Sequence, residues 1–344
     1  MNPLYLLLVT AVLGLLMLPM LRVPLETKVW TPRDTKKVVR LEGGIILRSL
    51  VVEHTAEIDW DAGDVTPYED AFAGAFNLNL FLADSNPIFS ARYDVWKHFH
   101  EAISQVVDDY DEVTGSGTDI VSFRTVIPFA DPNLPKPDDT AYDMALAKSP
   151  RLEITFDGLA AMTPDALGTS AVVSQETNVT MVGVQRPAGA PAVQTTMLRR
   201  FKQYATQGAS DLPAGSRDKT LKLDVGSTVR RVFITSRGAL ETTRAKSSDL
   251  LTTLEWYING NKYGAIPFLQ QQAIQRQEKH VIPQVGTVLQ DFDVSGDIDP
   301  MEMLSLIGVD GTAGINVGTA AAYTSGIEVA YMDETILFPP AVAG

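Results

Sequence analysis

The 344-residue sequence contains no cysteine, and this absence removes several kinds of chemistry at once. Disulfide bonds, thiolate nucleophiles and cysteine-ligated zinc or iron–sulfur centres are all excluded. Histidine is scarce as well, and the chain has only His54, His98, His100 and His280. His98 and His100 stand two residues apart, a spacing that does not share one face of a helix. We therefore expect these two side chains to be solvated helix residues and not a pair of metal ligands.

Basic residues are fewer than acidic ones: the chain has 28 Lys and Arg and 42 Asp and Glu, which gives a net charge of -14 at pH 7. A body of this sign repels phosphate backbones, so direct binding to nucleic acid is not expected. The exception is the N-terminal segment, where residues 1–40 carry six basic and two acidic side chains and leave -18 for the rest. The basic residues that we assign to a juxtamembrane segment are Arg22, Lys28, Arg33, Lys36 and Lys37.

An uncharged hydrophobic run precedes these basic residues, and residues 4–21 read LYLLLVTAVLGLLMLPML. Its length of about 18 residues reaches the lower limit for a helix that crosses a bilayer. The opening MNPLY lacks the basic residues of a secretion signal, so we expect the run to be retained as a membrane anchor. The anchor residues are Leu4, Leu7, Val9, Val12, Leu15 and Leu18. The alternative is a buried core helix. The basic flank predicts that the body stays on the cytoplasmic side, against the inner face of the membrane.

The rest of the sequence has the short alternating runs of an all-β protein. Examples are FNLNLFLA (76–83), IVSFRTVIPF (120–129), RLEITFDG (151–158) and NVTMVGV (178–184), each bounded by turn residues. Apolar residues recur at three and four only in residues 91–107 and 266–280, where we expect helices. The pattern predicts strands with two short inserted helices.

The sequence is internally repeated. RLEGGIILRSLVV (40–52) lies over KLDVGSTVRRVFI (222–234) without a gap, and DSNPIFSA (84–91) matches NGNKYGA (259–265) ahead of each helix. After the helices, TVIPFAD (125–131) matches TVLQDFD (287–293). We predict two tandem eight-stranded jelly rolls, with boundaries at 1–37 for the anchor and basic segment, 38–186 for the first roll, 187–217 for a linker and 218–344 for the second roll.

These stretches also carry a family resemblance. The run LPAGSRDKTLKLDVGSTVRRVFI (212–234), the hairpin LEWYINGNKYGAIP (254–267) and VLQDFDVSGDIDPMEMLSLIG (288–308) resemble the second unit of the double jelly-roll major capsid proteins of membrane-containing icosahedral phages. The corticovirus type is the most similar, with tectivirus coat proteins and adenovirus hexon more distant. The resemblance extends from about residue 38 to the end and rests on the whole pattern, not on one motif.

The resemblance implies a virion capsid protein that works by assembly. It implies a homotrimer whose six jelly rolls make a pseudo-hexameric tile over an internal lipid membrane. Its partners would be copies of itself, neighbouring capsomers, the membrane and other capsid proteins such as a vertex protein. A full N-terminal span departs from the family's usual pattern, so a minor membrane-linked capsid protein is a second reading.

The acidic stretch DFDVSGDIDPME (291–302) has the ligand spacing of a calcium loop. Pro283 and the β-rich residues 285–289 leave no room for the entering helix of an EF-hand. Two readings stay open: a solvated acidic turn, which is the default, or calcium held in a β-sandwich loop. The candidate calcium ligands are Asp291, Asp293, Asp297 and Asp299. No other cofactor is expected.

Two further function classes compete with the capsid. A membrane-anchored β-sandwich that binds glycans would have to be exported, which the basic flank argues against. A glycan-processing enzyme would need two carboxylates across a cleft, and the sequence has no GxSxG motif that would mark a nucleophilic serine. We therefore expect no catalytic activity.

Overall fold

The computed structural model describes residues 20–61, 65–83, 86–106, 108–132, 134, 136–186, 189, 192, 197–206, 218–240, 242–279, 283–293, 298, 302–309, 311–320 and 327–338. The strands in these residues form three sheets, with seven, nine and four members. The predicted anchor residues Leu4 to Leu18 lie outside the described residues. Within the described part, no helix is long and apolar enough to cross a membrane.

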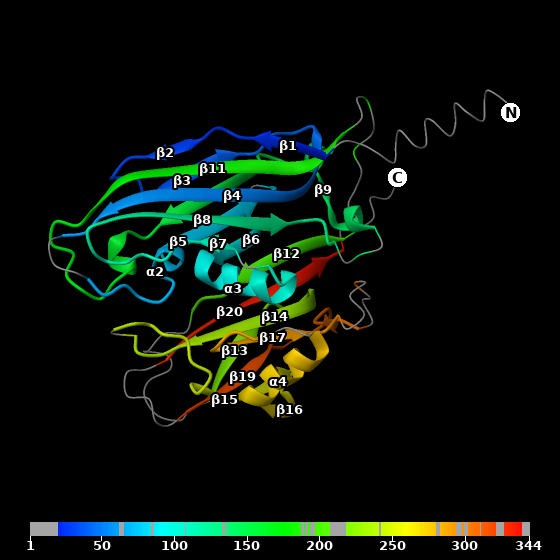
Figure 1. Ribbon diagram of the computed structural model, residues 1–344. Helices are drawn as coiled ribbons and strands as arrows, with labels where there is room; N and C mark the ends of the chain where they lie inside the picture. Colours follow the sequence, from blue (N-terminus) through cyan, green and yellow to red (C-terminus); the bar gives the residue numbers. More distant parts are fainter. Residues whose placement is uncertain are drawn as a thin grey trace, which may run out of the picture.

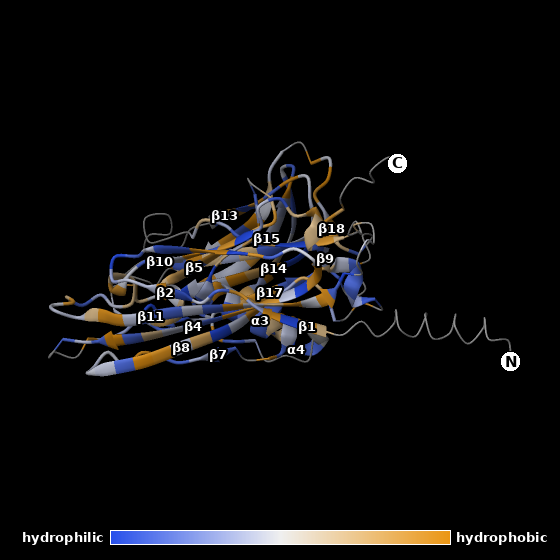
Figure 2. Ribbon diagram, turned by 90° about the horizontal axis from the view of Figure 1, so that it is seen from above, coloured by the Kyte–Doolittle hydropathy of each residue, from blue (hydrophilic) through white to orange (hydrophobic). Residues whose placement is uncertain are grey.

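The seven-stranded sheet has the order β1-β11-β4-β8-β7, with β2 also on β11 and β9 also on β4. Its long strands β4 and β8 alternate buried residues with half-buried or exposed ones, so one face is in the core and the other is turned outward. Figure 2 shows hydrophobic and hydrophilic residues succeeding one another along these strands. The members are β1 (Met20–Pro24), β2 (Lys28–Trp30), β4 (Ile45–Asp59), β7 (Asp109–Tyr110), β8 (Thr118–Pro128), β9 (Tyr142–Asp143) and β11 (Ala171–Gln185).

The nine-stranded sheet runs through both halves of the chain in the order β17-β14-β20-β12-β6-β5-β10-β3, with β18 also on β14. Strand β14 is buried along its whole length, because both faces of its half of the sheet are covered. The members are β3 (Lys36–Arg40), β5 (Phe76–Phe81), β6 (Pro87–Arg92), β10 (Arg151–Phe156), β12 (Leu198–Gln203), β14 (Thr228–Arg237), β17 (Thr287–Asp291), β18 (Leu304–Ser305) and β20 (Glu328–Leu337).

The four-stranded sheet has the order β13-β19-β15-β16. Its members are β13 (Asp218–Leu223), β15 (Leu251–Ile258), β16 (Asn261–Pro267) and β19 (Ala313–Thr319). The helices in the described residues are α2 (Ala71–Gly74), α3 (Tyr93–Ser104) and α4 (Phe268–Lys279), with short 3-10 turns at Pro137–Thr140, Met144–Leu146 and Leu159–Ala161. The two helices expected from periodicity, 91–107 and 266–280, are confirmed as α3 and α4.

The predicted repeat is present in the strand pairing. The order β3-β10-β5-β6 of the first half matches β13-β19-β15-β16 of the second, and β1-β11-β4-β8 matches β12-β20-β14-β17. Each of β6 and β16 leads directly into a twelve-residue helix, α3 or α4. We call β1 to β11 with α2 and α3 the first roll, and β12 to β20 with α4 the second roll. Figure 1 shows the first roll above the second, with α3 between them.

One stretch of the sequence repeat is displaced by a residue. The gapless match of 40–52 with 222–234 makes Val52 the counterpart of Ile234. Val52 pairs with Thr125, whereas Ile234 pairs with Val288 and not with Thr287. The sequence match at TVIPFAD was therefore wrong by one position, because the repeated Thr-Val letters are not at equivalent places in the ladder.

The boundaries predicted at residues 37, 186 and 217 stay predictions, but strands lie on both sides of them. Strands β1 and β2 precede residue 38 and pair with β11 of the first roll. Strand β12 lies inside the predicted linker 187–217, where it pairs antiparallel with β20 and parallel with β6.

Candidate functional site: the seam between the two rolls

The two rolls are joined by one strand and one helix, and this junction is the candidate functional site, which we call the seam. Strand β12 places Phe201 opposite Phe89 and Lys202 opposite Ser90 of β6, so the nine-stranded sheet continues across the junction. On its other side β12 pairs with β20 from Leu198↔Leu337 to Gln203↔Met332. A continuous sheet fixes the rolls against rotation more firmly than a flexible linker would.

Aromatic side chains fill the apolar part of the seam. Phe99 of α3 lies 5.7 Å from Phe233 of the second roll, measured between ring centroids, and 6.0 Å from Phe201. Trp96 packs edge-on against Phe201 at 5.1 Å and donates its indole N–H to Thr125 Oγ1 at 3.0 Å. Phe201, Phe233, Leu289, Ala330 and Met332 belong to the same buried cluster as the first-roll core. The seam is therefore packed like a domain interior.

A first group of buried charges lies at one end of the seam. Arg237 of the second roll donates to Asp70 Oδ2 at 2.9 Å and to Asp94 Oδ2 at 3.1 Å, both from the first roll. Lys246 of the second roll approaches the same Asp70 oxygen at 2.9 Å and His98 Nε2 at 2.8 Å. Burial by itself would raise the pKa of Asp70, but the hydrogen bond and charge of His98, with Lys246 and Arg237, hold that pKa well below its usual range.

A second group of buried charges is centred on Glu334 of β20. It accepts from Arg199 Nε at 2.7 Å, from Arg231 at 2.8 Å and from Arg230 at 3.2 Å. Arg230 has no exposed side-chain surface and also bonds Asp131 of the first roll. Burial opposes ionisation, yet the three arginines hold the pKa of Glu334 well below its usual value. A buried charge that loses its partner is costly, so these pairs favour one arrangement of the rolls.

The candidate calcium residues are divided between the seam and the undescribed part of the chain. Asp291 Oδ2 accepts from Arg231 Nε at 2.9 Å, and Asp293 Oδ2 accepts from Arg230 Nε at 2.7 Å. Asp297 and Asp299 lie outside the described residues. In the part of the chain that the structure describes, no group of three or more His, Asp or Glu side chains could hold a metal ion. The calcium assignment stays a prediction. In the structure, Asp291 and Asp293 are paired with the guanidinium groups of Arg231 and Arg230.

The two histidines expected to be solvated are buried, and this expectation was wrong. His98 is 3% and His100 is 8% exposed. His98 faces Asp70 at 2.8 Å and His100 faces Asp108 at 2.8 Å. The second roll covers the side of α3 that carries His98, where Lys246 approaches it, whereas His100 is buried against Asp108 and Trp96 of the first roll.

The predicted juxtamembrane basic residues lie on the surface of the first roll. Arg22 is on β1, Lys28 on β2, and Lys36 and Lys37 on β3, while Arg33 is in the turn between β2 and β3. Lys28 pairs with Glu26 at 2.5 Å, Lys36 with Glu153 at 2.6 Å and Lys37 with Asp34 at 2.7 Å. A role for these residues beside a membrane stays a prediction.

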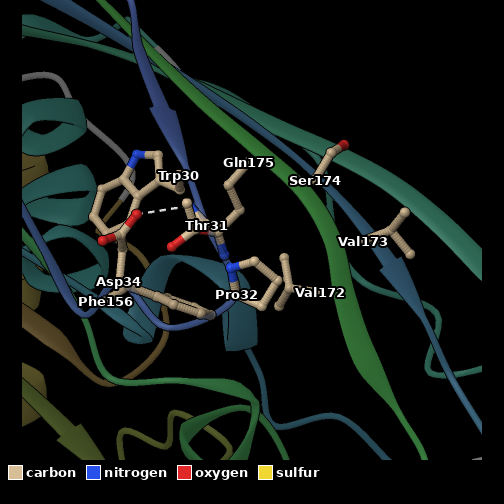
Figure 3. Close-up of a pocket in the computed structure, with 9 residues that line it drawn as sticks. All are labelled: Trp30, Thr31, Pro32, Asp34, Phe156, Val172, Val173, Ser174 and Gln175. Atoms are coloured by element: carbon tan, nitrogen blue, oxygen red, sulfur yellow. Dashed lines mark hydrogen bonds between the residues drawn. The ribbon is translucent and has the colours of Figure 1, made fainter.

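The described cavities are small or open. Figure 3 shows a shallow pocket of about 40 Å³ at the β2 end of the first roll, where the Thr31 N–H donates to Asp34 Oδ2 at 2.6 Å beside Trp30, Phe156 and Gln175. A wider polar groove of about 270 Å³ follows β5, β6 and β12, lined by amide and hydroxyl side chains that include Asn77, Asn79, Ser90 and Gln203. The first pocket is too small for a drug-sized ligand, and the second lacks the apolar walls that usually enclose one.

Sequence reasoning missed the charged part of the seam. Arg230 and Arg231 stand in the apolar strand TVRRVFITSR, and Asp333 and Glu334 stand in EVAYMDETIL. Charged pairs inside strands that are otherwise apolar were the available signal, because a charge buried in a sheet needs a partner on a neighbouring element.

Comparison with known proteins finds the fold and not a sequence family. No protein-family model matches the sequence, and no curated protein is significantly similar to it. Among solved structures, the major capsid protein of Sulfolobus turreted icosahedral virus superposes with a TM-score of 0.70 at 14% identity, covering 93% of this chain and 97% of that one.

Two other viral proteins match over similar lengths. The major capsid protein of bacteriophage PM2 gives a TM-score of 0.56 at 11% identity over 92% of this chain and 97% of that one. The Faustovirus major capsid protein gives 0.59 at 8% identity over 93% and 90%. These neighbours are double jelly-roll major capsid proteins of icosahedral viruses. The predicted mostly-β double jelly roll is confirmed as the fold of this chain.

Proposed function

We propose that this chain is a major capsid protein of a membrane-containing icosahedral phage and that its function is assembly. The observation that carries the proposal is that both rolls and the seam between them are matched along almost the whole length of viral major capsid proteins. The seam supports it, because a tile subunit must hold its two rolls in one fixed relation.

In this proposal three chains associate so that six rolls form a pseudo-hexameric tile. Two similar but not identical rolls in one chain give a threefold trimer six near-equivalent sides. Tiles then contact neighbouring tiles and a vertex protein, and the shell encloses a lipid membrane. The negative body is not expected to bind nucleic acid directly.

The N-terminal run would hold each tile to the membrane. Residues 4–21 are uncharged, but Met20 and Leu21 belong to β1 and pair with β11, so the anchor would be residues 4–19 and lead directly into the first roll. The basic residues Arg22, Lys28 and Arg33 follow within a short distance and suit an anionic lipid surface. During assembly the protein would be at the cytoplasmic face of the host membrane.

The test is the native mass and morphology of the full chain after expression. Light scattering in mild detergent should give three times the mass of one chain, and electron microscopy should show hexagonal tiles or closed shells. A stable monomer that binds oligosaccharides would overturn the capsid proposal in favour of a glycan-binding module.

A further inference from the structure

The connection between β14 and β15 in the second roll closes over the start of α2 in the first roll. We call its described residues, 238–240 and 242–250, the clasp loop. The Glu69 N–H, just before α2, donates to the Thr243 carbonyl at 2.8 Å. The Lys246 N–H donates to Glu69 Oε2 at 2.6 Å. The clasp loop is therefore hydrogen-bonded to the first roll at two points, at the same end of the seam as the buried charges around Asp70.

A small cavity lies beside the clasp loop, between the two rolls. Its volume is about 20 Å³, and three arginines line it: Arg92 of β6, Arg237 of β14 and Arg244 of the clasp loop. The ring of Tyr68 lies against it as well. Space of this size holds one water molecule or one monatomic ion, and it is too small for phosphate or sulfate.

Two guanidinium N–H groups at this cavity have no acceptor among the residues that the structure describes. They are the Nε–H groups of Arg237 and Arg244, and both nitrogen atoms are buried. Arg237 is only 3% exposed, and its other two nitrogens already donate to oxygen atoms of Glu69, Asp70 and Asp94. A buried donor without an acceptor is destabilising, so an occupant that accepts from both Nε–H groups would stabilise the seam.

The carboxylates at the cavity have cations of their own. Those that line it are Glu69, Asp70, Asp94 and Glu328. Ion pairs of 2.6 to 3.1 Å join them to Arg92, Lys97, Arg237 and Lys246. His98 also faces Asp70, and its other ring nitrogen faces Glu101.

Arg244 is the exception in this group of charges. It makes no ion pair with a carboxylate in the described part of the chain, and its guanidinium carbon lies 4.2 Å from the centre of the Tyr68 ring. The four carboxylates and four cations of the cavity balance one another, so Arg244 leaves one positive charge in excess. A single monovalent anion would neutralise this charge.

The backbone of Arg244 also points to a role for its side chain. Its φ is 47°, in the left-handed region that favours glycine. Ala239 of the same loop has a φ of 49°, and its carbonyl accepts from the Arg244 N–H at 3.0 Å. Strained residues of this kind cluster at functional sites, where the surrounding contacts hold them in place. In this loop the strained arginine is the residue that brings a free guanidinium to the cavity.

We propose that the cavity binds one chloride ion, held by the Nε–H groups of Arg237 and Arg244. The ion accepts both hydrogen bonds and balances the charge of Arg244. It thereby fastens the clasp loop of the second roll to the first roll. Phosphate and sulfate are excluded by size, and a cation is disfavoured by the two N–H donors. The site is formed within one chain, so the inference does not depend on capsid assembly.

The first measurement is the melting temperature of the full chain in mild detergent, as chloride replaces gluconate at constant ionic strength. Gluconate is too large for the cavity, and constant ionic strength keeps the screening of surface charges the same. A ligand that binds only the folded state stabilises it, so we expect a saturable rise of about 2 °C or more. Equal melting temperatures in the two salts would overturn the proposal.

Arg244→Gly tests the anion ligand without disturbing the fold. Glycine adopts the left-handed backbone readily, so the variant should fold while lacking the guanidinium. Its melting temperature should not respond when chloride replaces gluconate. The matched control is Ala239→Gly, which has the same backbone conformation in the same loop and keeps every charge. Its response to chloride should equal that of the parent, and equal responses in the two variants would contradict the site.

Bromide locates the ion, because it substitutes for chloride and scatters X-rays anomalously. Crystals of the parent grown in sodium bromide should show an anomalous peak in contact with Nε of both Arg237 and Arg244, and crystals of Arg244→Gly should not. A peak without a chloride-dependent melting temperature would mean an adventitious ion only. Density without an anomalous signal would mean a water molecule. Either of these last two results overturns the proposed chloride site.

Discussion

Arg48 and Arg230 occupy the same β-bulge in the two rolls. The ladder passes from Leu47↔Gly183 to Ser49↔Val182 in the first roll and from Val229↔Thr335 to Arg231↔Glu334 in the second, omitting one arginine each time. The backbone carbonyl of each arginine accepts from the N–H of the phenylalanine that directly follows the neighbouring strand, Phe129 after β8 and Phe292 after β17. The side chains have diverged: Arg48 pairs at the surface with Asp138 at 2.5 Å, and Arg230 is fully buried in the seam.

This burial makes the seam sensitive to loss of one charge. Glu334→Gln should lower the free energy of unfolding by about 3 to 5 kcal/mol, because three buried arginines lose their shared carboxylate. Urea unfolding at pH 7 measures it. The matched control is Glu53→Gln, whose pair with Arg124 is exposed and should contribute less than about 1 kcal/mol. Equal losses in the two variants would contradict a special role for the seam.

The same carboxylate has a predictable pH dependence. The folded pKa of Glu334 is lowered from 4.5, so its stabilising contribution is present above that value and lost as pH falls further. The stability difference between the parent and Glu334→Gln should therefore shrink when unfolding is measured below about pH 4. A difference that stays constant down to pH 2 would contradict this assignment.

Asp333 should behave in the opposite way. Burial raises its pKa to about 7, although it accepts the Tyr204 hydroxyl at 2.6 Å and lies near Arg200. Because the folded state then holds the proton more tightly than the unfolded chain, stability falls as pH rises from about 4 to 7. Asp333→Asn should remove this fall and be more stable than the parent at pH 8, by on the order of 2 to 4 kcal/mol. Unfolding curves from pH 4 to 8 measure it, and a difference independent of pH would count against it.

Phe99 should be the main apolar contact of the seam. Phe99→Ala should cost about 3 to 5 kcal/mol, since it leaves a cavity against Phe233 and Phe201. The control is Phe338→Ala, at a side chain that is 43% exposed and should change stability little. Calorimetry tests whether the two rolls unfold together, because a weakened seam should let them melt in two separate transitions. A single, unshifted transition would argue that the rolls are held by other contacts.

The acidic loop can be tested without disturbing the arginines. Asp291 and Asp293 are paired with Arg231 and Arg230, so Asp297→Asn with Asp299→Asn is the cleaner variant. If the loop holds calcium, millimolar calcium should raise the melting temperature of the parent but not of the variant. Magnesium at the same concentration should leave both melting temperatures unchanged. An equal response in both proteins would leave the loop as a solvated acidic turn.

Much of this architecture could be predicted from the sequence, because the two rolls share short stretches with the same strand, turn and helix pattern. The gapless match that pairs Gly44 with Gly226 reflects a backbone need, since both glycines have positive φ, at 90° and 83°. What could not be predicted was the relation between the rolls. His98 was expected in solvent because a single roll leaves that helix face bare, and β12 was hidden because Pro- and Gly-rich residues precede it. The burial of His98 and the pairing of β12 both depend on contacts between residues far apart in the sequence, which local sequence patterns do not predict.

The position of β20 has a consequence for synthesis on the ribosome. It is the last strand in the described part of the chain, yet with β12 and β14 it covers α3 of the first roll. Until residues 328–337 have been translated, the buried cluster that contains Phe99 lacks Ala330 and Met332. Incomplete chains should therefore expose apolar surface and aggregate, so that premature termination before β20 is complete yields insoluble protein and not a slightly destabilised fold.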